Sequence, residues 1–386
     1  MHMTRIDLFV GAALTVAAGP FLTGHVAPWW QPPHYDWIAN AENSVVVINS
    51  ITPSGMGPEI HMGAGFLVAI ERDRAYILTA AHVAPDDGSK IIVTLSNRNQ
   101  VYGKVLGAGP TSQADVSVVG IPAAAAKGLP VLRLGNSDTL QPGEHLTIIG
   151  HPLFNYDTVT HGIVSAIHRA DPGLGLTAQD NILTDTPVNG GNSGGPVLDD
   201  QTREVVAITD FLPQMPNSYP NPEYGGKFDG LGALVSSRIA EKVYDDVRLW
   251  GRVVSGTSHL EVVDDVTRVL LDNPAVPKVS DGARIVAVQD GSAAAEVGIK
   301  PNDVIVLIDG RQINDANGFN VLEFLSHPGD IETITVRRRQ KLISFAFPQG
   351  GDMMPPSNVI VPAGEEPRTA GSIAHDVAIL SLQTSP

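Results

Sequence analysis

The chain has 386 residues, of which 43% are hydrophobic and 17% charged, a composition typical of a folded globular protein with one or two domains. It contains no cysteine, so thiol catalysis, zinc–thiolate sites and disulfide bonds are excluded. The net charge of −16 argues against nucleic acid or an anionic membrane surface as the main partner, because phosphate groups would be repelled.

The amino terminus carries a candidate targeting segment. Arg5 precedes an uncharged and mostly apolar stretch, Leu8–Gly24, which predicts an export signal or an uncleaved membrane anchor and hence an extracytoplasmic protein. Asp7 and Pro20 leave a buried helix or strand as the alternative. The Pro-rich aromatic segment Trp29–Trp37 is predicted to be an extended surface arm, which either mediates self-association or contacts a membrane surface.

From Ser44 onwards the sequence consists of short β-branched runs. Each run has four to eight residues and is bounded by Gly, Pro, Asn or Asp, as in GAGFLVAI and RAYILTAAHV, which predicts an all-β barrel or sandwich. Between Leu212 and Leu231 lies a long stretch without periodicity, which we interpret as a functional or mobile loop. The first convincing helix is predicted at Ser236–Leu249. Its apolar residues recur at helical spacing, namely Ile239, Val243, Val247 and Trp250.

A second, smaller unit follows from Gly251 to Pro348. Strand-like runs such as ARIVAVQ and ETITVRR alternate there with helix-like segments such as NGFNVLEFL, which predicts an α+β domain. The residues after Gln349 have the composition of a linker and are expected to be disordered. The predicted domain organisation is therefore an N-terminal arm at 1–38, a first domain at 39–249, a second domain at 250–348 and a tail at 349–386.

Ser193 is the candidate nucleophile. It lies in GGNSGGP, between two strand-like runs, where glycines on both sides allow a sharp turn and bring backbone amides towards a developing oxyanion. The natural oxyanion donors are the amides of Gly191 and Ser193. A glycine-rich hairpin with an incidental serine is the alternative for this motif alone. A nucleophile of the α/β-hydrolase type would need a helix directly after the serine, whereas Pro196 and a strand-like run follow here.

His82 and Asp115 are the candidate base and orienting acid. His82 ends a strand-like run in TAAHV, and Asp115 opens the apolar run DVSVV. A general base at a strand end can present its ring to a cleft, and a partly buried carboxylate can hold the imidazole in the correct tautomer. Taken singly, either residue could be structural. In the order His, Asp, Ser, the three indicate two β-barrels with a cleft between them.

The three motifs TAAHV, ADVSVV and NGGNSGGPV resemble those of chymotrypsin-like serine proteases. Further segments, including LRLGNSDTLQPGEHLTIIGHP and AVQDGSAAAEVGIKPNDVIVLIDGRQI, are similar to the HtrA/Deg subgroup with its C-terminal PDZ domain. The resemblance covers about Asp36–Pro348. It implies a mainly β fold, with a chymotrypsin-like double β-barrel followed by a smaller α+β PDZ-like domain. The nearest match to the family's carboxylate-binding loop is Leu249, Trp250, Gly251 and Arg252.

The three motifs thus predict a serine endopeptidase, and the resemblance implies that it cleaves unfolded or misfolded proteins in protein quality control. The resemblance also implies a homo-oligomer, usually a trimer. The alternatives are a PDZ-containing chaperone or scaffold with little proteolysis and a purely structural interaction protein. We expect no metal and no cofactor, because no metal-ligand spacing or nucleotide-binding pattern occurs.

The expected specificity pocket is apolar. Val188, Leu231 and Ala233 are its predicted lining, so cleavage should follow small or medium aliphatic residues. Pro187 stands six residues before Ser193, where a trypsin-like enzyme would carry an Asp, and Asp185 is interpreted as structural.

Overall fold

The computed structural model describes residues 36–52, 59–111, 114–151, 158–171, 176–211, 214–215, 226–227, 230–268 and 279–351. The predicted targeting segment Leu8–Gly24 lies outside these ranges, as do residues 352–386 of the predicted tail and most of the predicted loop at 212–231. For the start of the tail the expectation of disorder is wrong, because Gln349 is buried and donates a hydrogen bond to Glu332, and Gly350 pairs with Thr257. Within the described ranges, no helix is both long and apolar enough to cross a bilayer.

The first described element is a short helix, α1 (Asp36–Glu42). It contains Asp36 and Trp37, the last two residues of the predicted extended arm. The other residues of that arm, 29–35, lie outside the described ranges. Trp37 and Ile38 pack, partly buried, against the core formed by Ala41 and Val45. For Trp37 the expectation of an extended arm is therefore wrong, because its apolar ring packs on the barrel instead of remaining in solvent.

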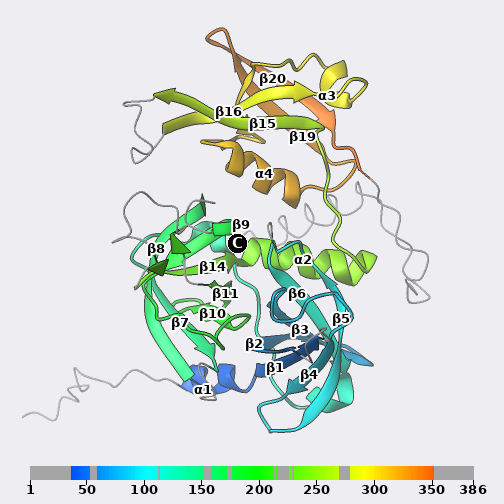
Figure 1. Ribbon diagram of the computed structural model, residues 1–386, viewed down its shortest axis with the longest axis vertical. Helices are drawn as coiled ribbons and strands as arrows, with labels where there is room; N and C mark the ends of the chain where they lie inside the picture. Colours follow the sequence, from blue (N-terminus) through cyan, green and yellow to red (C-terminus); the bar gives the residue numbers. More distant parts are fainter. Residues whose placement is uncertain are drawn as a thin grey trace, which may run out of the picture. The chain divides into compact units, whose positions relative to one another are not determined.

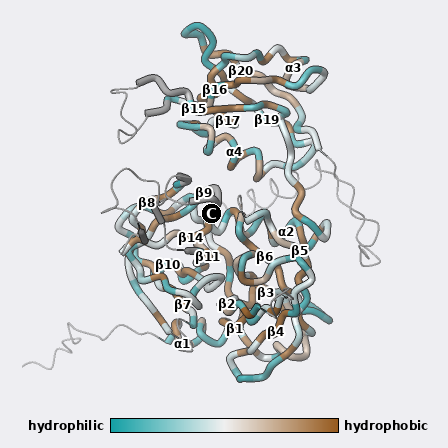
Figure 2. Tube along the Cα trace, in the orientation of Figure 1, coloured by the Kyte–Doolittle hydropathy of each residue, from teal (hydrophilic) through white to brown (hydrophobic). Residues whose placement is uncertain are grey.

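Six strands form the first closed barrel (Figure 1). All pair antiparallel in the ring order β1-β2-β3-β6-β5-β4. Many of their β-branched side chains are buried in one core cluster. Figure 2 shows hydrophobic residues along these strands. The strands are β1 (Val45–Thr52), β2 (Glu59–Ile70), β3 (Arg74–Ala80), β4 (Lys90–Thr94), β5 (Gln100–Ala108) and β6 (Val116–Pro122). A 3₁₀ turn, η1 (Ala123–Ala126), follows the last of them.

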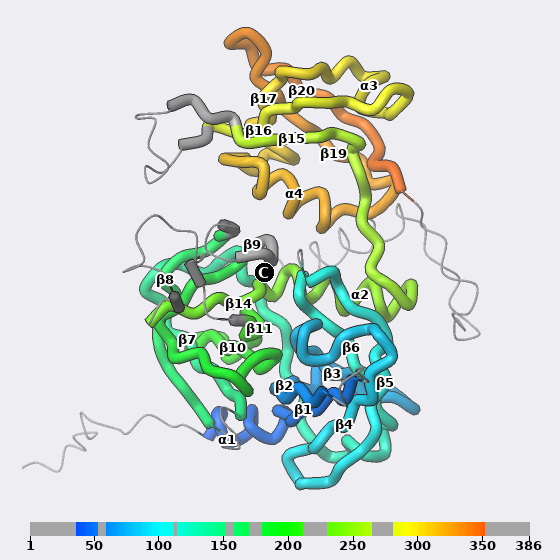
Figure 3. The backbone as a smooth tube through the Cα atoms, viewed as in Figure 1, coloured from blue at the N-terminus to red at the C-terminus, as the bar shows by residue number. Residues whose placement is uncertain are grey.

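A second closed barrel repeats the arrangement with the ring order β10-β11-β14-β9-β8-β7. Its strands are β7 (His145–Gly150), β8 (Thr158–Asp171), β9 (Leu176–Thr184), β10 (Pro196–Asp199), β11 (Val205–Phe211) and β14 (Gly232–Ser236). The 3₁₀ turn η2 (Ser137–Thr139) precedes it, and the short strands β12 (Gln214–Met215) and β13 (Gly226–Lys227) form a separate ribbon. Figure 3 shows the chain completing the first barrel before it enters the second. One core cluster contains side chains of both barrels, so the two pack against each other.

The predicted helix after the barrels is α2 (Ser237–Trp250). The four apolar positions that predicted it are all buried, namely Ile239, Val243, Val247 and Trp250. The helix ends at Gly251, whose φ of 69° places it in the left-handed region and whose amide donates to the carbonyl of Val247.

The C-terminal domain is a mixed α+β unit with its own core. Its sheet has the order β15-β16-β17-β19-β20, with β18 paired to β17. The strands are β15 (Leu260–Arg268), β16 (Val279–Val288), β17 (Val304–Ile308), β18 (Arg311–Gln312), β19 (Ile331–Arg338) and β20 (Lys341–Pro348). The helices are α3 (Ala293–Glu296) and α4 (Ala316–Leu325). Phe319 of α4 and Phe347 of β20 are almost completely buried in the core of this domain. The predicted mainly β architecture, two barrels followed by a smaller α+β domain, is confirmed.

Candidate active site

His82 lies in the turn that follows β3. The amides of Val83 and Ala84 both donate to the carbonyl of Ala80, which closes a tight turn directly after the strand. The side chain of His82 is 43% exposed, although its neighbours Ala81 and Val83 are buried. The turn therefore presents the imidazole at the surface of an otherwise rigid strand end, as a general base requires.

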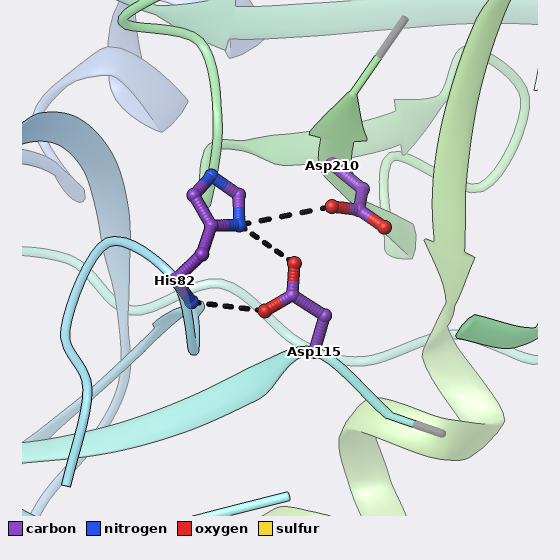
Figure 4. Close-up of side chains that lie close together, drawn as sticks. All are labelled: His82, Asp115 and Asp210. Carbon is purple, nitrogen blue, oxygen red and sulfur yellow. Dashed lines mark hydrogen bonds and ion pairs between the residues drawn. The ribbon is translucent and has the colours of Figure 1, made fainter. Parts of the chain in front are cut away.

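Asp115 precedes β6 and holds this imidazole. Its Oδ2 lies 2.6 Å from His82 Nδ1, and its Oδ1 accepts a hydrogen bond of 2.9 Å from the backbone amide of His82 (Figure 4). Asp115 is only 5% exposed. Burial acts to raise the pKa of its carboxyl, but the hydrogen bonds from its partners outweigh burial and lower the pKa. Asp115 is therefore an ionised acceptor for the Nδ1 proton.

Ser193 is presented by the loop between β9 and β10. Its carbonyl accepts a hydrogen bond of 2.8 Å from the amide of Ala64 on β2, so this loop is tied to the first barrel. Gly194 has a φ of 84°, and a Cβ at this position would collide with Thr79 Oγ1 and the carbonyl of Ala64. Only glycine fits here, which explains the glycine after the nucleophile.

The hydroxyl of Ser193 donates a 2.9 Å hydrogen bond to the backbone carbonyl of Asp210, on β11. The proposed oxyanion donors, the amides of Gly191 and Ser193, make no hydrogen bond among those between described residues. Gly191 has a φ of 101°, which a side chain would disfavour. Their role as oxyanion donors stays a prediction.

Asp210 is a member of the cluster that the sequence interpretation missed. It is 2% exposed, and its Oδ1 lies 3.8 Å from His82 Nδ1. Atoms of His82, Asp115 and Asp210 that could bind a metal ion all lie within 4.8 Å of one another. Among the described residues, these three therefore form the candidate metal site. Two ligands of one zinc ion, each about 2.1 Å from it, would lie roughly 3 Å or more apart. The 2.6 Å contact of His82 with Asp115 instead has the length of a hydrogen bond.

The predicted specificity residues lie near one another in the second barrel. Val188 and Ala233 are buried and Leu231 is half-buried. A Cβ at Gly232 would collide with the side chain of Val188, so that glycine leaves room for it. Asp185 accepts a hydrogen bond of 2.7 Å from the amide of Ile163, in keeping with a structural role. The lining of the pocket by these side chains stays a prediction.

The four residues predicted to bind a peptide terminus lie at the end of α2. Leu249 and Trp250 are its last two residues, Trp250 is 6% exposed, and Gly251 is the cap. Arg252 follows directly, and β15 of the C-terminal domain begins eight residues further on. Peptide binding by this segment stays a prediction.

Comparisons with known proteins agree with this geometry. Residues 63–208 match a family model described as "Trypsin-like peptidase domain", and residues 263–347 match one described as "PDZ domain". The Synechocystis sp. protein named HhoB is 31% identical over 287 residues, which cover 72% of this chain and 64% of that protein. A Pseudomonas fluorescens protein named "Probable periplasmic serine endoprotease DegP-like" is 35% identical over 253 residues, covering 65% of this chain and 48% of the relative.

Solved structures give the same result. The structure "HtrA-type protease AlgW with tripeptide" superposes with a TM-score of 0.61 and 27% identity, covering 87% of this chain and all of the other. The chain spans between about half and two thirds of the length of the two relatives named above. The chain therefore has a trypsin-like peptidase domain followed by a PDZ domain, and in sequence and structure it is similar to HtrA-type proteases.

Proposed function

We propose that this chain is a serine endopeptidase that hydrolyses unfolded or misfolded polypeptides in protein quality control. The observation that carries the proposal is the 2.6 Å contact of His82 Nδ1 with the buried carboxylate of Asp115. The loop of Ser193 is tied to the same barrel by the hydrogen bond from the amide of Ala64. The name of the Pseudomonas fluorescens relative, a serine endoprotease, supports the same activity.

In the proposed mechanism, the Ser193 hydroxyl turns from the Asp210 carbonyl towards Nε2 of His82 and attacks the peptide carbonyl. His82 takes the proton and later gives it to the leaving amine, while Asp115 fixes the tautomer and stabilises the imidazolium. The amides of Gly191 and Ser193 hold the oxyanion of the tetrahedral intermediate. Water then attacks the acyl-enzyme, with His82 again acting as base, and releases the acid product and the serine.

The activity is tested with Ser193→Ala. Wild type should hydrolyse an unfolded protein and react covalently with an organophosphonate at Ser193, whereas the variant should do neither yet unfold at nearly the same temperature. Loss of the nucleophile in such a triad costs about 10⁶-fold in kcat. Cleavage by the variant within about tenfold of wild type, or a wild type that is not labelled, would instead favour a scaffold that binds unfolded chains.

We expect cleavage after small or medium aliphatic residues. The buried Val188 and Ala233 and the half-buried Leu231 would provide an apolar pocket of limited size. The cut sites in an unfolded protein, mapped by mass spectrometry, should be enriched in Val, Ala and Leu. A map dominated by Arg and Lys would contradict the pocket assignment.

The C-terminal domain is proposed to hold an extended substrate while the barrels cut it. A PDZ sheet can add an extended chain as a further strand, which raises the effective substrate concentration at the active site. We further propose a homo-oligomer, with a trimer as the expected size, that functions outside the cytoplasm, in the periplasm or tethered by its N-terminal segment. The word "periplasmic" in the name of the Pseudomonas fluorescens relative supports the compartment. Light scattering of the full chain would test the trimer, and a monomeric mass would contradict it.

A further inference from the structure

Asp210 lies where an acidic side chain is least expected. It is the penultimate residue of β11, in the second barrel, and its carboxyl points across to His82 and Asp115 of the first barrel (Figure 4). Ile208 and Thr209 before it are fully buried, and Asp210 itself is 2% exposed. An isolated carboxylate in such a place would be strongly destabilising, so its charge must be removed or matched.

His82, the basic residue of this cluster, already pairs with Asp115. His82 Nδ1 lies 2.6 Å from Asp115 Oδ2 but 3.8 Å from Asp210 Oδ1, too far for a hydrogen bond. Asp115 also accepts from the backbone amide of His82. Asp210 Oδ2 is buried without a hydrogen-bond partner among the described residues. The hydrogen bonds from His82 therefore favour the ionised form of Asp115. Asp210 receives no such hydrogen bond from the described residues of the first barrel.

Two carboxyl groups this close in a buried site share one negative charge. Ligand-type oxygens of Asp115 and Asp210 lie within 4.8 Å of each other and of His82. The pKa of Asp210 is raised well above its ordinary value, first by burial and then by the neighbouring carboxyl group of Asp115. The pKa of Asp115 is lowered in spite of burial, first by its hydrogen bond with His82 and then by the neighbouring Asp210.

We propose that Asp210 is a positioning residue of the triad, a neutral carboxylic acid that donates a hydrogen bond to the Asp115 carboxylate. This bond fixes the carboxylate against Nδ1 of His82 while the backbone carbonyl of the same residue accepts from Ser193. Because Asp210 is neutral, a single negative charge faces the imidazolium formed during catalysis. The inference deepens the proposed function and rests on it.

The test uses a matched pair at this position in the full chain. Asp210→Thr and Asp210→Val have nearly the same size and shape, but only Thr has a hydroxyl that can donate to Asp115. On a short peptide, Thr should keep kcat within about fivefold of wild type. Val should lower kcat by about 10- to 100-fold with little change in KM, the size expected for losing one hydrogen bond to a charged group. Equal kcat values for Thr and Val would overturn the proposal.

Asp210→Asn tests the charge state. An amide also donates to Asp115, so kcat should stay within about fivefold and the acid limb of the kcat/KM profile should stay in place. If Asp210 were ionised in the wild type, removing its charge would favour neutral His82 and move that limb to lower pH by about one unit or more, which would overturn the proposal. Asp199→Asn, at a buried carboxyl that caps a turn in the same barrel, is the control and should change neither kcat nor the limb.

A readout independent of activity separates this inference from the proposed function. In the Ser193→Ala background, the infrared spectrum at pH 7 should contain a protonated carboxyl band that Asp210→Asn removes. If that band is missing, the inference fails even when wild type is labelled by an organophosphonate. If the band is present but wild type is neither labelled nor active, the proposed function fails instead.

Discussion

The barrels and the C-terminal domain both bury carboxyl groups, but they surround them with different partners. In the barrels, Asp115 and Asp210 lie beside His82, whose side chain is 43% exposed and pairs with Asp115. In the C-terminal domain, Asp303 is 1% exposed and forms two hydrogen bonds of 2.6 Å with the guanidinium of Arg338. A fixed cation beside a buried acid keeps that acid charged and ties strands and loops together, whereas a titratable base beside it can gain or lose a proton.

Glu332 of β19 represents a third arrangement. It is 8% exposed and accepts a hydrogen bond of 2.7 Å from the side-chain amide of Gln349. Burial first, and then the charges of Asp309, Glu323 and Asp330, raise its pKa to about 7. With an amide instead of a cation beside it, this carboxyl retains a proton at a pH where most glutamates are ionised. The charge of a buried acid is therefore decided by its donors, and burial alone does not predict it.

The largest expected effect is a loss of kcat that distinguishes a catalytic His–Asp pair from one with a purely structural role. Asp115→Asn should lower kcat by about 10³- to 10⁴-fold, because an amide does not hold the imidazole in the productive tautomer. The control is Asp200→Asn, since Asp200 lies 2.7 Å from His161 Nε2 in the second barrel and accepts from Thr147. Steady-state kinetics on a short peptide should show activity within about twofold of wild type for the control. Equal losses in the two variants would mean that the Asp115 pair has no special role.

A smaller effect is expected when the fixed cation of the C-terminal domain is removed. Arg338→Ala leaves the buried carboxylate of Asp303 with the amide of Lys300 as its described partner. We expect a loss of about 2–4 kcal/mol in the stability of this domain, below the cost for a fully buried pair because Arg338 is 27% exposed. Hydrogen exchange of β17 and β19 would measure it, with the exposed neighbour Arg339→Ala as control. An unchanged exchange rate in Arg338→Ala would show that the pair contributes no stability.

Local pattern in the sequence predicted the β strands and drew attention to Ser193, His82 and Asp115, through the glycines around Ser193 and the strand ends at the other two residues. The division into two barrels was predicted from the order of these three residues and from the family resemblance, and their catalytic role stays a prediction. Asp210 could not be found in this way. In the run REVVAITDF it resembles a polar strand end, and only the pairing of β11 with β10 and β14 brings it to the cleft. A signal was present in hindsight, namely an acid inside an otherwise apolar strand that follows the nucleophile.

Two other residues show the same limit. Trp250 has the helical spacing of a core residue and is also part of the predicted peptide-binding segment, because sequence spacing does not show where a helix ends. The end is set by the left-handed conformation of Gly251. Glu332 lies in ETITVRR on the same strand face as the apolar Ile334 and Val336, so alternation predicts its burial. The sequence does not show which donors and charges surround its carboxyl, and these set its pKa.

The smallest expected effect tests whether donors decide the charge of Glu332. A raised carboxyl pKa means that the folded state binds more protons than the unfolded state between about pH 4.5, the ordinary value, and about pH 7. The stability of the C-terminal domain should therefore fall as pH rises through this window and stay at the lower level above it. Glu332→Gln removes the charge and keeps the shape, so it should stabilise the domain at pH 8 by about 1–3 kcal/mol and leave it almost unchanged at pH 4. Hydrogen exchange of β19 at the two pH values would measure both effects, and the exposed Glu261→Gln on β15 is the control, with no expected change. If Glu332→Gln gave the same small change at both pH values, the pKa of the Glu332 carboxyl would not be raised. The side-chain amide of Gln349 would then be enough to stabilise its charged form.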